Sequence, residues 1–64
     1  MAAYSVFTRT IDGTLVSKTE SLEASDAWAL FSDVVENTTA SIVVEMIQSD
    51  GIVVARELGE QNDS

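Results

Sequence analysis

Hydrophobic and polar positions along the chain follow two different periods. Residues 4–10 and 14–19 are rich in Val, Thr and aromatic side chains, and residues 41–48 and 52–58 alternate between apolar and polar positions. Segments of this kind predict β-strands. Between the two pairs, from Ser25 onward, apolar residues recur with the spacing of one helix face. The pattern therefore predicts the element order β-β-α-β-β.

A single amphipathic helix is predicted near residues 22–36. Ser21 or Ser25 could cap its start, and Asn37 followed by two threonines indicates its end. Trp28 lies on the flank of the apolar stripe, where a core role is the simpler interpretation. The stripe itself consists of five residues at i, i+3, i+4, i+7 and i+8, namely Ala27, Leu30, Phe31, Val34 and Val35.

Two Asp-Gly dipeptides, at 12–13 and 50–51, predict two hairpins, because Asp and Gly tolerate the positive φ of tight turns. The register of the first hairpin stays open between a two-residue turn and a three-residue turn with a bulge. For the second, a two-residue turn is favoured because it places Glu45 opposite Arg56, an attractive cross-strand pair. The segments that begin at these dipeptides, DGTLVSK (12–18) and DGIVVAR (50–56), resemble each other. The likeness has two explanations, shared hairpin chemistry or duplication of a two-stranded unit.

These elements predict an α+β fold, a four-stranded antiparallel sheet with one helix packed on one face. Residues 1–58 form the expected single domain, and residues 59–64, which lack apolar side chains, are expected to fray as an acidic tail. Both faces of the second hairpin are largely apolar, and one helix covers only one face of a sheet. The other face is therefore expected to serve self-association or a partner.

Charge changes this picture most. The 64 residues include eleven Asp and Glu, three Lys and Arg and no His, a formal net charge of −8, while 45% of residues are hydrophobic. Such a charge repels nucleic acid and anionic membranes and steers the protein toward basic surfaces. The start shows neither a signal peptide nor a membrane span, so a cytoplasmic protein is expected that binds neither nucleic acid directly nor a membrane.

Composition also limits the chemistry. Without Cys and His, a disulfide, a Cys/His zinc site, the commonest general base and the best nucleophile are all missing. No glycine-rich phosphate loop and no calcium loop occurs. We therefore expect a protein that is not an enzyme, with no catalytic residues, no cofactor and no metal.

The acidic residues remain as candidates for partner binding. Asp26 and Asp33 would lie about 10.5 Å apart along a helix axis, a sparse repeat on the scale of DNA phosphates. No Lys or Arg occurs between Thr19 and Gly51, whereas ordinary surface helices mix both signs. The predicted partner-binding residues on the polar side of the helix and its lead-in are Glu20, Glu23, Asp26, Asp33 and Glu36.

In its size, acidity, lack of Cys and His, and β-β-α-β-β layout with ESLEASDAWALFSDVVE as the helix, the chain resembles the small acidic phage-encoded anti-CRISPR proteins. Several of these are DNA mimics. The resemblance implies an inhibitor in the host bacterial cytoplasm that blocks a basic DNA-binding or PAM-reading groove of a type I surveillance complex, a ribonucleoprotein. The alternative from a different class is a small structural or adaptor module that forms a homodimer through its uncovered sheet face.

Overall fold

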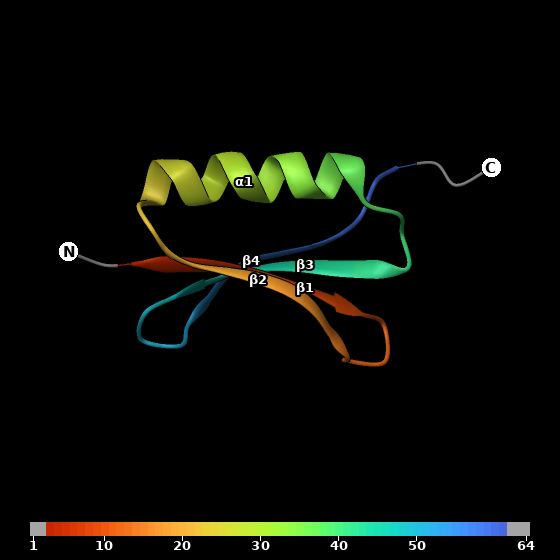
Figure 1. Cartoon of the computed structure of the whole chain (residues 1–64), viewed down its shortest axis with the longest axis horizontal. Coiled ribbons are helices and arrows are strands. Elements are labelled where there is room, and N and C mark those ends of the chain that lie inside the picture. Colours follow the sequence, from red (N-terminus) through yellow and green to blue (C-terminus); the bar gives the residue numbers. More distant parts are fainter. Residues whose placement is uncertain (1–2, 62–64) are drawn as a thin grey trace.

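The computed structural model describes residues 3–61 and confirms the α+β fold with its element order (Figure 1). The elements are β1 (Tyr4–Thr10), β2 (Leu15–Leu22), α1 (Ala24–Asn37), β3 (Ile42–Gln48) and β4 (Val53–Leu58). All neighbouring strands are antiparallel, in the spatial order β2-β1-β3-β4. The two hairpins therefore meet through their first strands, and β2 and β4 form the sheet edges.

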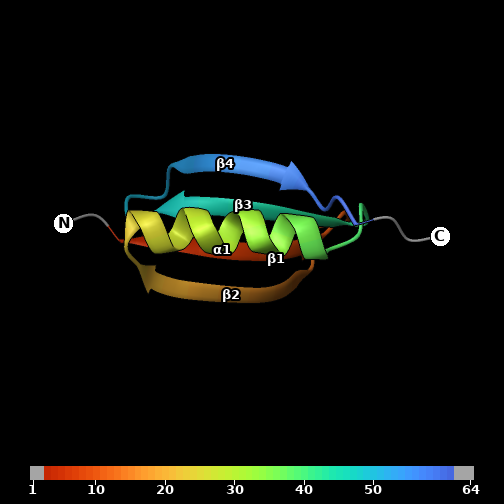
Figure 2. The ribbon, with the colours of Figure 1, turned by 90° about the horizontal axis from the view of Figure 1, so that it is seen from above.

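Helix α1 lies over the two central strands and leaves both edge strands on its flanks (Figure 2). The predicted stripe is confirmed, because Ala27, Phe31 and Val35 are buried and Leu30 and Val34 pack against them. Burial of such side chains supplies the main driving force for folding. Within residues 3–61, the buried apolar core consists of six residues, Val6, Ala27, Phe31, Val35, Val44 and Met46.

Both hairpins turn through three residues. The loops are Ile11–Gly13 and Ser49–Gly51, closed by Thr10 with Thr14 and by Gln48 with Ile52, and both glycines have positive φ. The first hairpin therefore adopts the three-residue alternative. The two-residue turn predicted for the second is wrong at the loop, yet Glu45 still lies opposite Arg56. A β-bulge between the turn and this pair explains the outcome, since its one extra residue restores the predicted register.

The bulges make the two hairpins equivalent. Ser17 pairs with Thr8 and Leu15 with Arg9, which leaves Val16 as the extra residue, and Val54 is the extra residue in the same place of the second hairpin. A constant offset in residue number relates Gly13 to Gly51, Val16 to Val54 and Lys18 to Arg56. It also relates Phe7 to Glu45, and these two are paired at the centre of the β1–β3 ladder. The sheet thus has an approximate two-fold axis between its central strands.

The start of the helix differs from the prediction, whereas its predicted end at Asn37 is confirmed. Glu23, in extended conformation, occupies the N-cap position without a side-chain hydrogen bond, and Ser25 lies inside the first turn. Asn37 is the last helical residue, and its Nδ2 donates to the Asp33 carbonyl oxygen at 2.7 Å. Trp28 is 46% exposed and packs edge-on against Phe31, so its interpretation as a core residue is wrong.

Residues 59–61 are ordered against the helix end, unlike the expected fraying tail. The N–H groups of Gly59, Glu60 and Gln61 donate to the carbonyl oxygens of Ile42, Val35 and Thr38. The bond to Val35 satisfies a carbonyl that the helix itself leaves open near its C-terminus. We call this segment, residues 59–61, the C-terminal strap; residues 62–64 of the predicted tail lie outside the described residues.

Candidate functional site

The candidate partner-binding carboxylates of α1 share its solvent side. Asp26, Asp33 and Glu36 are exposed, on the side of α1 away from its buried stripe, and Glu23 is exposed directly before the first turn. Asp26 suits the positive end of the helix dipole. We call Glu23, Asp26, Asp33 and Glu36 the acidic helix face.

Two of the predicted carboxylates have partners within the fold. Glu20 lies in the edge strand β2 rather than in a lead-in to the helix, and its Oε1 is 3.8 Å from Lys18 Nζ. The structure therefore separates Glu20 from the acidic helix face. Asp33 stays on that face, where its Oδ1 accepts a hydrogen bond from Asn37 Nδ2 at 3.2 Å.

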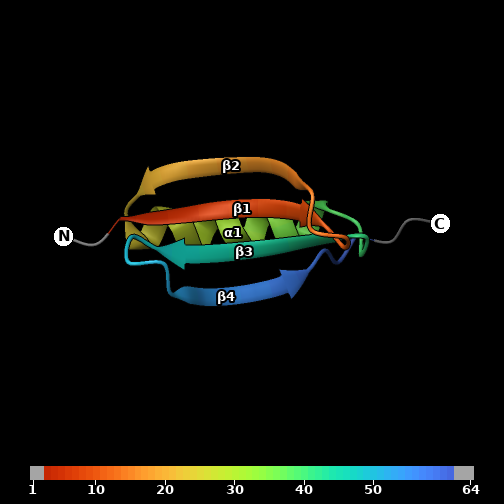
Figure 3. The same cartoon turned by 90° about the horizontal axis from the view of Figure 1, so that it is seen from below.

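All three cationic side chains of the chain lie on the sheet. Arg9 Nε donates to Glu45 Oε1 at 3.1 Å, and Arg56 Nε donates to Oε2 of the same carboxylate at 3.1 Å. Glu45 faces away from the helix, because it alternates with Val44 and Met46 in the core, yet it is only 5% exposed. The two guanidinium groups cover it on the open face shown in Figure 3. Charge is thus segregated, with cations on the sheet and only acids on the helix.

Two further carboxylates extend the acidic surface beyond the helix. Glu57 pairs with the buried Val44 and therefore points to the helix side of the sheet. A shallow hollow of about 190 Å³ lies between α1, β4 and the C-terminal strap, and its lining includes Glu36, Glu57 and Glu60. The alternation of the second hairpin could have placed Glu57 here from sequence, whereas Glu60 was assigned to a fraying tail.

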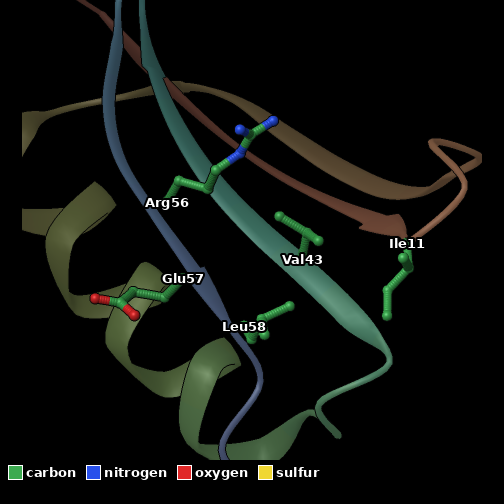
Figure 4. A pocket seen from close by; sticks show the side chains of 5 residues that line it. All are labelled: Ile11, Val43, Arg56, Glu57 and Leu58. Atoms are coloured by element: carbon green, nitrogen blue, oxygen red, sulfur yellow. The ribbon is translucent and has the colours of Figure 1, made fainter.

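The open face of the sheet mixes apolar and charged side chains. A shallow hollow of about 490 Å³ near the β1–β2 turn is lined by Ile11, Val43, Arg56, Glu57 and Leu58. Figure 4 shows Glu57 pointing toward the helix, while Arg56 extends along the open face. Phe7 lies on this face beneath Arg9, whose guanidinium carbon is 5.5 Å from the ring centroid.

The described residues bring together no group of three or more side chains suited to holding a metal ion. Among them, α1 is neither long nor apolar enough to cross a membrane. In the first turn, hydrogen bonds reach the carboxyl group of Asp12. The Thr10 hydroxyl and then the Thr14 N–H donate to it and lower its pKa below the ordinary value of 3.8. These bonds stabilise the turn locally.

Comparisons of the chain with family models, with curated proteins and with solved structures found no match. The features from which a function can be inferred are therefore the charge distribution and the uncovered surfaces of this chain.

Proposed function

We propose that the chain is a non-enzymatic inhibitor whose acidic helix face occupies a basic DNA-binding surface of a host protein or ribonucleoprotein complex. The segregation of charge is the observation that carries the proposal. Arg9 and Arg56 are held by Glu45, and Lys18 by Glu20, so each cation has a partner on the sheet. Within residues 3–61 the acidic helix face has no cationic neighbour to neutralise it. Carboxylates in such a field accept charge-assisted hydrogen bonds from Arg and Lys.

The resemblance to small acidic anti-CRISPR proteins narrows the proposed partner to a type I surveillance complex. The carboxylates of Asp26 and Asp33 lie about 10.5 Å apart along the helix. A groove that binds DNA phosphates could bind carboxylates with this spacing at some of its phosphate positions. The inhibitor would then compete with DNA for one site. Its binding would weaken as salt rises, because contacts between exposed charges are screened.

The test uses two double variants that change the net charge equally. Asp26→Lys with Glu36→Lys reverses the acidic helix face and spares Asp33, whose bond to Asn37 supports the last helical turn. Glu20→Lys with Asp50→Lys places the same charges on β2 and the second turn. Each exposed ion pair contributes about 0.2–1 kcal/mol, so single substitutions would have small effects.

Binding to purified type I complexes, with and without target DNA, is then measured at low and high salt. We expect the helix-face variant to lose binding and the control variant to retain most of it. Equal binding by both variants and the wild-type protein, without salt dependence, would show that the acidic helix face is not the binding surface.

The alternative function, an adaptor that dimerises through the open sheet face, meets an obstacle. Arg9, Glu45 and Arg56 lie at the centre of that face, so face-to-face burial would remove two partly exposed guanidinium groups from water. Self-association through this face is therefore unfavourable.

A further inference from the structure

Trp28 is an exposed aromatic residue on the helix side of the molecule. It is the single Trp of the chain, and it is 46% exposed. Among the described residues, the other exposed large apolar side chains belong to the two hairpins, whereas Trp28 lies in α1, which also carries the acidic helix face. Trp is enriched among the few residues that supply most of the energy of a protein interface. Its place beside the acids therefore suits an anchor for the partner.

Helix geometry places Trp28 on the flank of α1 that faces β4. Positions 28, 32 and 36 are four residues apart and share one side of the helix. Ser32 and Glu36 line the hollow between α1, β4 and the C-terminal strap, so Trp28 belongs to the same flank. Phe31 connects the two, because it also lines this hollow and its ring centroid is 6.0 Å from that of Trp28. We call Trp28 together with this hollow the Trp28 flank.

The hollow suits the side chain of an arginine. Its lining combines the apolar Phe31 and Val35 with the carboxylates of Glu36, Glu57 and Glu60. Within residues 3–61, no ion pair engages these three carboxylates. An arginine packs its methylene stem on apolar surface while its guanidinium donates charge-assisted hydrogen bonds to carboxylates. Both parts of such a side chain therefore find a complement in the hollow.

The indole favours the same residue type. A planar guanidinium stacks on an aromatic face, and Trp is the best ring for this contact. The ammonium group of lysine has no planar fork for stacking or for bidentate bonds to a carboxylate. A net charge of −8 attracts any cation, whereas an indole next to carboxylates discriminates in favour of arginine.

We propose that the Trp28 flank binds arginine side chains of the partner, one stacked on the indole of Trp28 and one inserted between Glu36, Glu57 and Glu60. The inference rests on the proposed function for the class of partner, a basic surface, and adds the residue type that is recognised. It also extends the interface from the outer side of α1 toward β4. Trp28 and Glu57 lie outside the acidic helix face, so variants of these two residues test the inference separately.

The probes are fluorescein-labelled hexa-arginine and hexa-lysine, which carry equal charge. Fluorescence anisotropy at about 0.15 M KCl measures the dissociation constants of their complexes with the full chain. We expect the wild-type protein to bind hexa-arginine about threefold or more tightly than hexa-lysine. Trp28→Leu should remove most of this preference, and Trp28→Phe, which keeps an aromatic face, should retain part of it. Circular dichroism checks that both variants fold.

A matched pair of variants tests the hollow. Glu57→Gln and Glu20→Gln remove the same charge with the same change of side chain, but Glu57 lines the hollow and Glu20 lies in the opposite edge strand. We expect Glu57→Gln to weaken hexa-arginine binding about threefold and Glu20→Gln to weaken it less than about twofold. Equal affinity of the wild-type protein for the two peptides, an undiminished preference in Trp28→Leu, or equal effects of the two Gln variants would overturn the inference.

Binding to purified type I complexes separates this inference from the proposed function. If Asp26→Lys with Glu36→Lys loses binding while Trp28→Leu and Glu57→Gln bind as the wild-type protein does, the proposed function stands and the inference is overturned. If the wild-type protein prefers hexa-arginine through Trp28 but does not bind these complexes, the arginine-binding flank stands and the type I complex is the wrong partner.

Discussion

Gly59 is the residue at which close approach of the backbone leaves no room for a side chain. A Cβ atom at this position would lie 2.2 Å from the carbonyl oxygens of both Thr38 and Thr39. Both oxygens belong to the segment that follows α1, and the Thr38 oxygen also accepts the N–H of Gln61. The Thr39 oxygen accepts the N–H of Ile42, so neither oxygen can move without disturbing a backbone hydrogen bond. Any side chain at residue 59 therefore separates the strap from the helix end.

We predict that Gly59→Ala lowers the free energy of unfolding by about 1–3 kcal/mol, the usual range for overpacking. Urea denaturation followed by circular dichroism measures it. Glu60→Ala is the control, because the Glu60 side chain is exposed and its backbone bond to Val35 persists. Similar midpoints for the two variants would mean that the strap does not hold the helix end.

Asp12 gives a prediction about pH. Its pKa is lowered by the Thr10 hydroxyl and then by the Thr14 N–H. A carboxyl group with a depressed pKa in the folded state contributes stability above its unfolded pKa, and that contribution is lost as pH falls through the folded value. We expect the Asp12 carboxyl resonance to titrate below 3.8 and Thr10→Val to raise its pKa. An unchanged pKa in Thr10→Val would exclude the hydroxyl as the cause.

At the scale of elements, α1 and β3 hold the molecule together. Phe31 and Val35 meet Val44 and Met46 between the helix and the central strands. The residue that follows Phe31 in the helix, Ser32, is exposed. Neighbouring positions in α1 therefore differ sharply in what they contribute.

We predict that Phe31→Ala lowers the free energy of unfolding by about 3–5 kcal/mol through the cavity it leaves, a large fraction of the stability of a small domain. Ser32→Ala should change it little. Denaturant midpoints of the two variants decide the matter, and equal midpoints would mean that the helix packs through a different face.

How far the sequence predicts these elements depends on the range of the interactions. Helical spacing identified Ala27, Phe31 and Val35 correctly, because that pattern is set within one element. The loop of the second hairpin was mispredicted, since a three-residue turn and a bulge at Val54 offset each other and leave Glu45 opposite Arg56. The local sequence pattern therefore predicts the pairing of residues far from the turn correctly. It does not show that a longer turn and a bulge together produce this pairing.

Contacts between distant segments were beyond local patterns altogether. Arg9 reaches Glu45 only because β1 lies beside β3, and strand order is not encoded in the spacing of residues within one strand. The C-terminal strap was missed for a similar reason, since Gly59–Gln61 is held by backbone bonds that need no apolar side chain. Of the acidic residues predicted to act together, Glu20 was misplaced because β2 extends to Leu22.

At the scale of the whole molecule, acids predominate on one side. All three cations form their ion pairs with Glu45 or Glu20 on the sheet, so the acidic helix face and the carboxylates of Glu57 and Glu60 repel one another across a small fold. Self-repulsion of this kind destabilises the compact state. Folding is therefore expected to respond to ionic strength.

We predict that added KCl raises the urea midpoint of unfolding, because the screening length falls from about 10 Å at 0.1 M to about 3 Å at 1 M. Asp26→Asn combined with Glu36→Gln removes two of the repelling charges and should flatten this dependence. A midpoint that falls with salt would show that the ion pairs of Glu45 outweigh the repulsion.

The approximate two-fold axis of the sheet has a consequence for the direction of the helix. Rotation about that axis returns the same face of the sheet but reverses any helix lying on it, with Val6 and Val44 exchanged. A sheet of this symmetry would accept α1 in either direction with similar apolar contacts. The connections remove the ambiguity, because Glu23 alone joins β2 to α1, whereas residues 38–41 join α1 to β3. The direction in which α1 crosses the sheet is thus set by the length of one connection. The same connection determines where its acidic residues lie over the sheet.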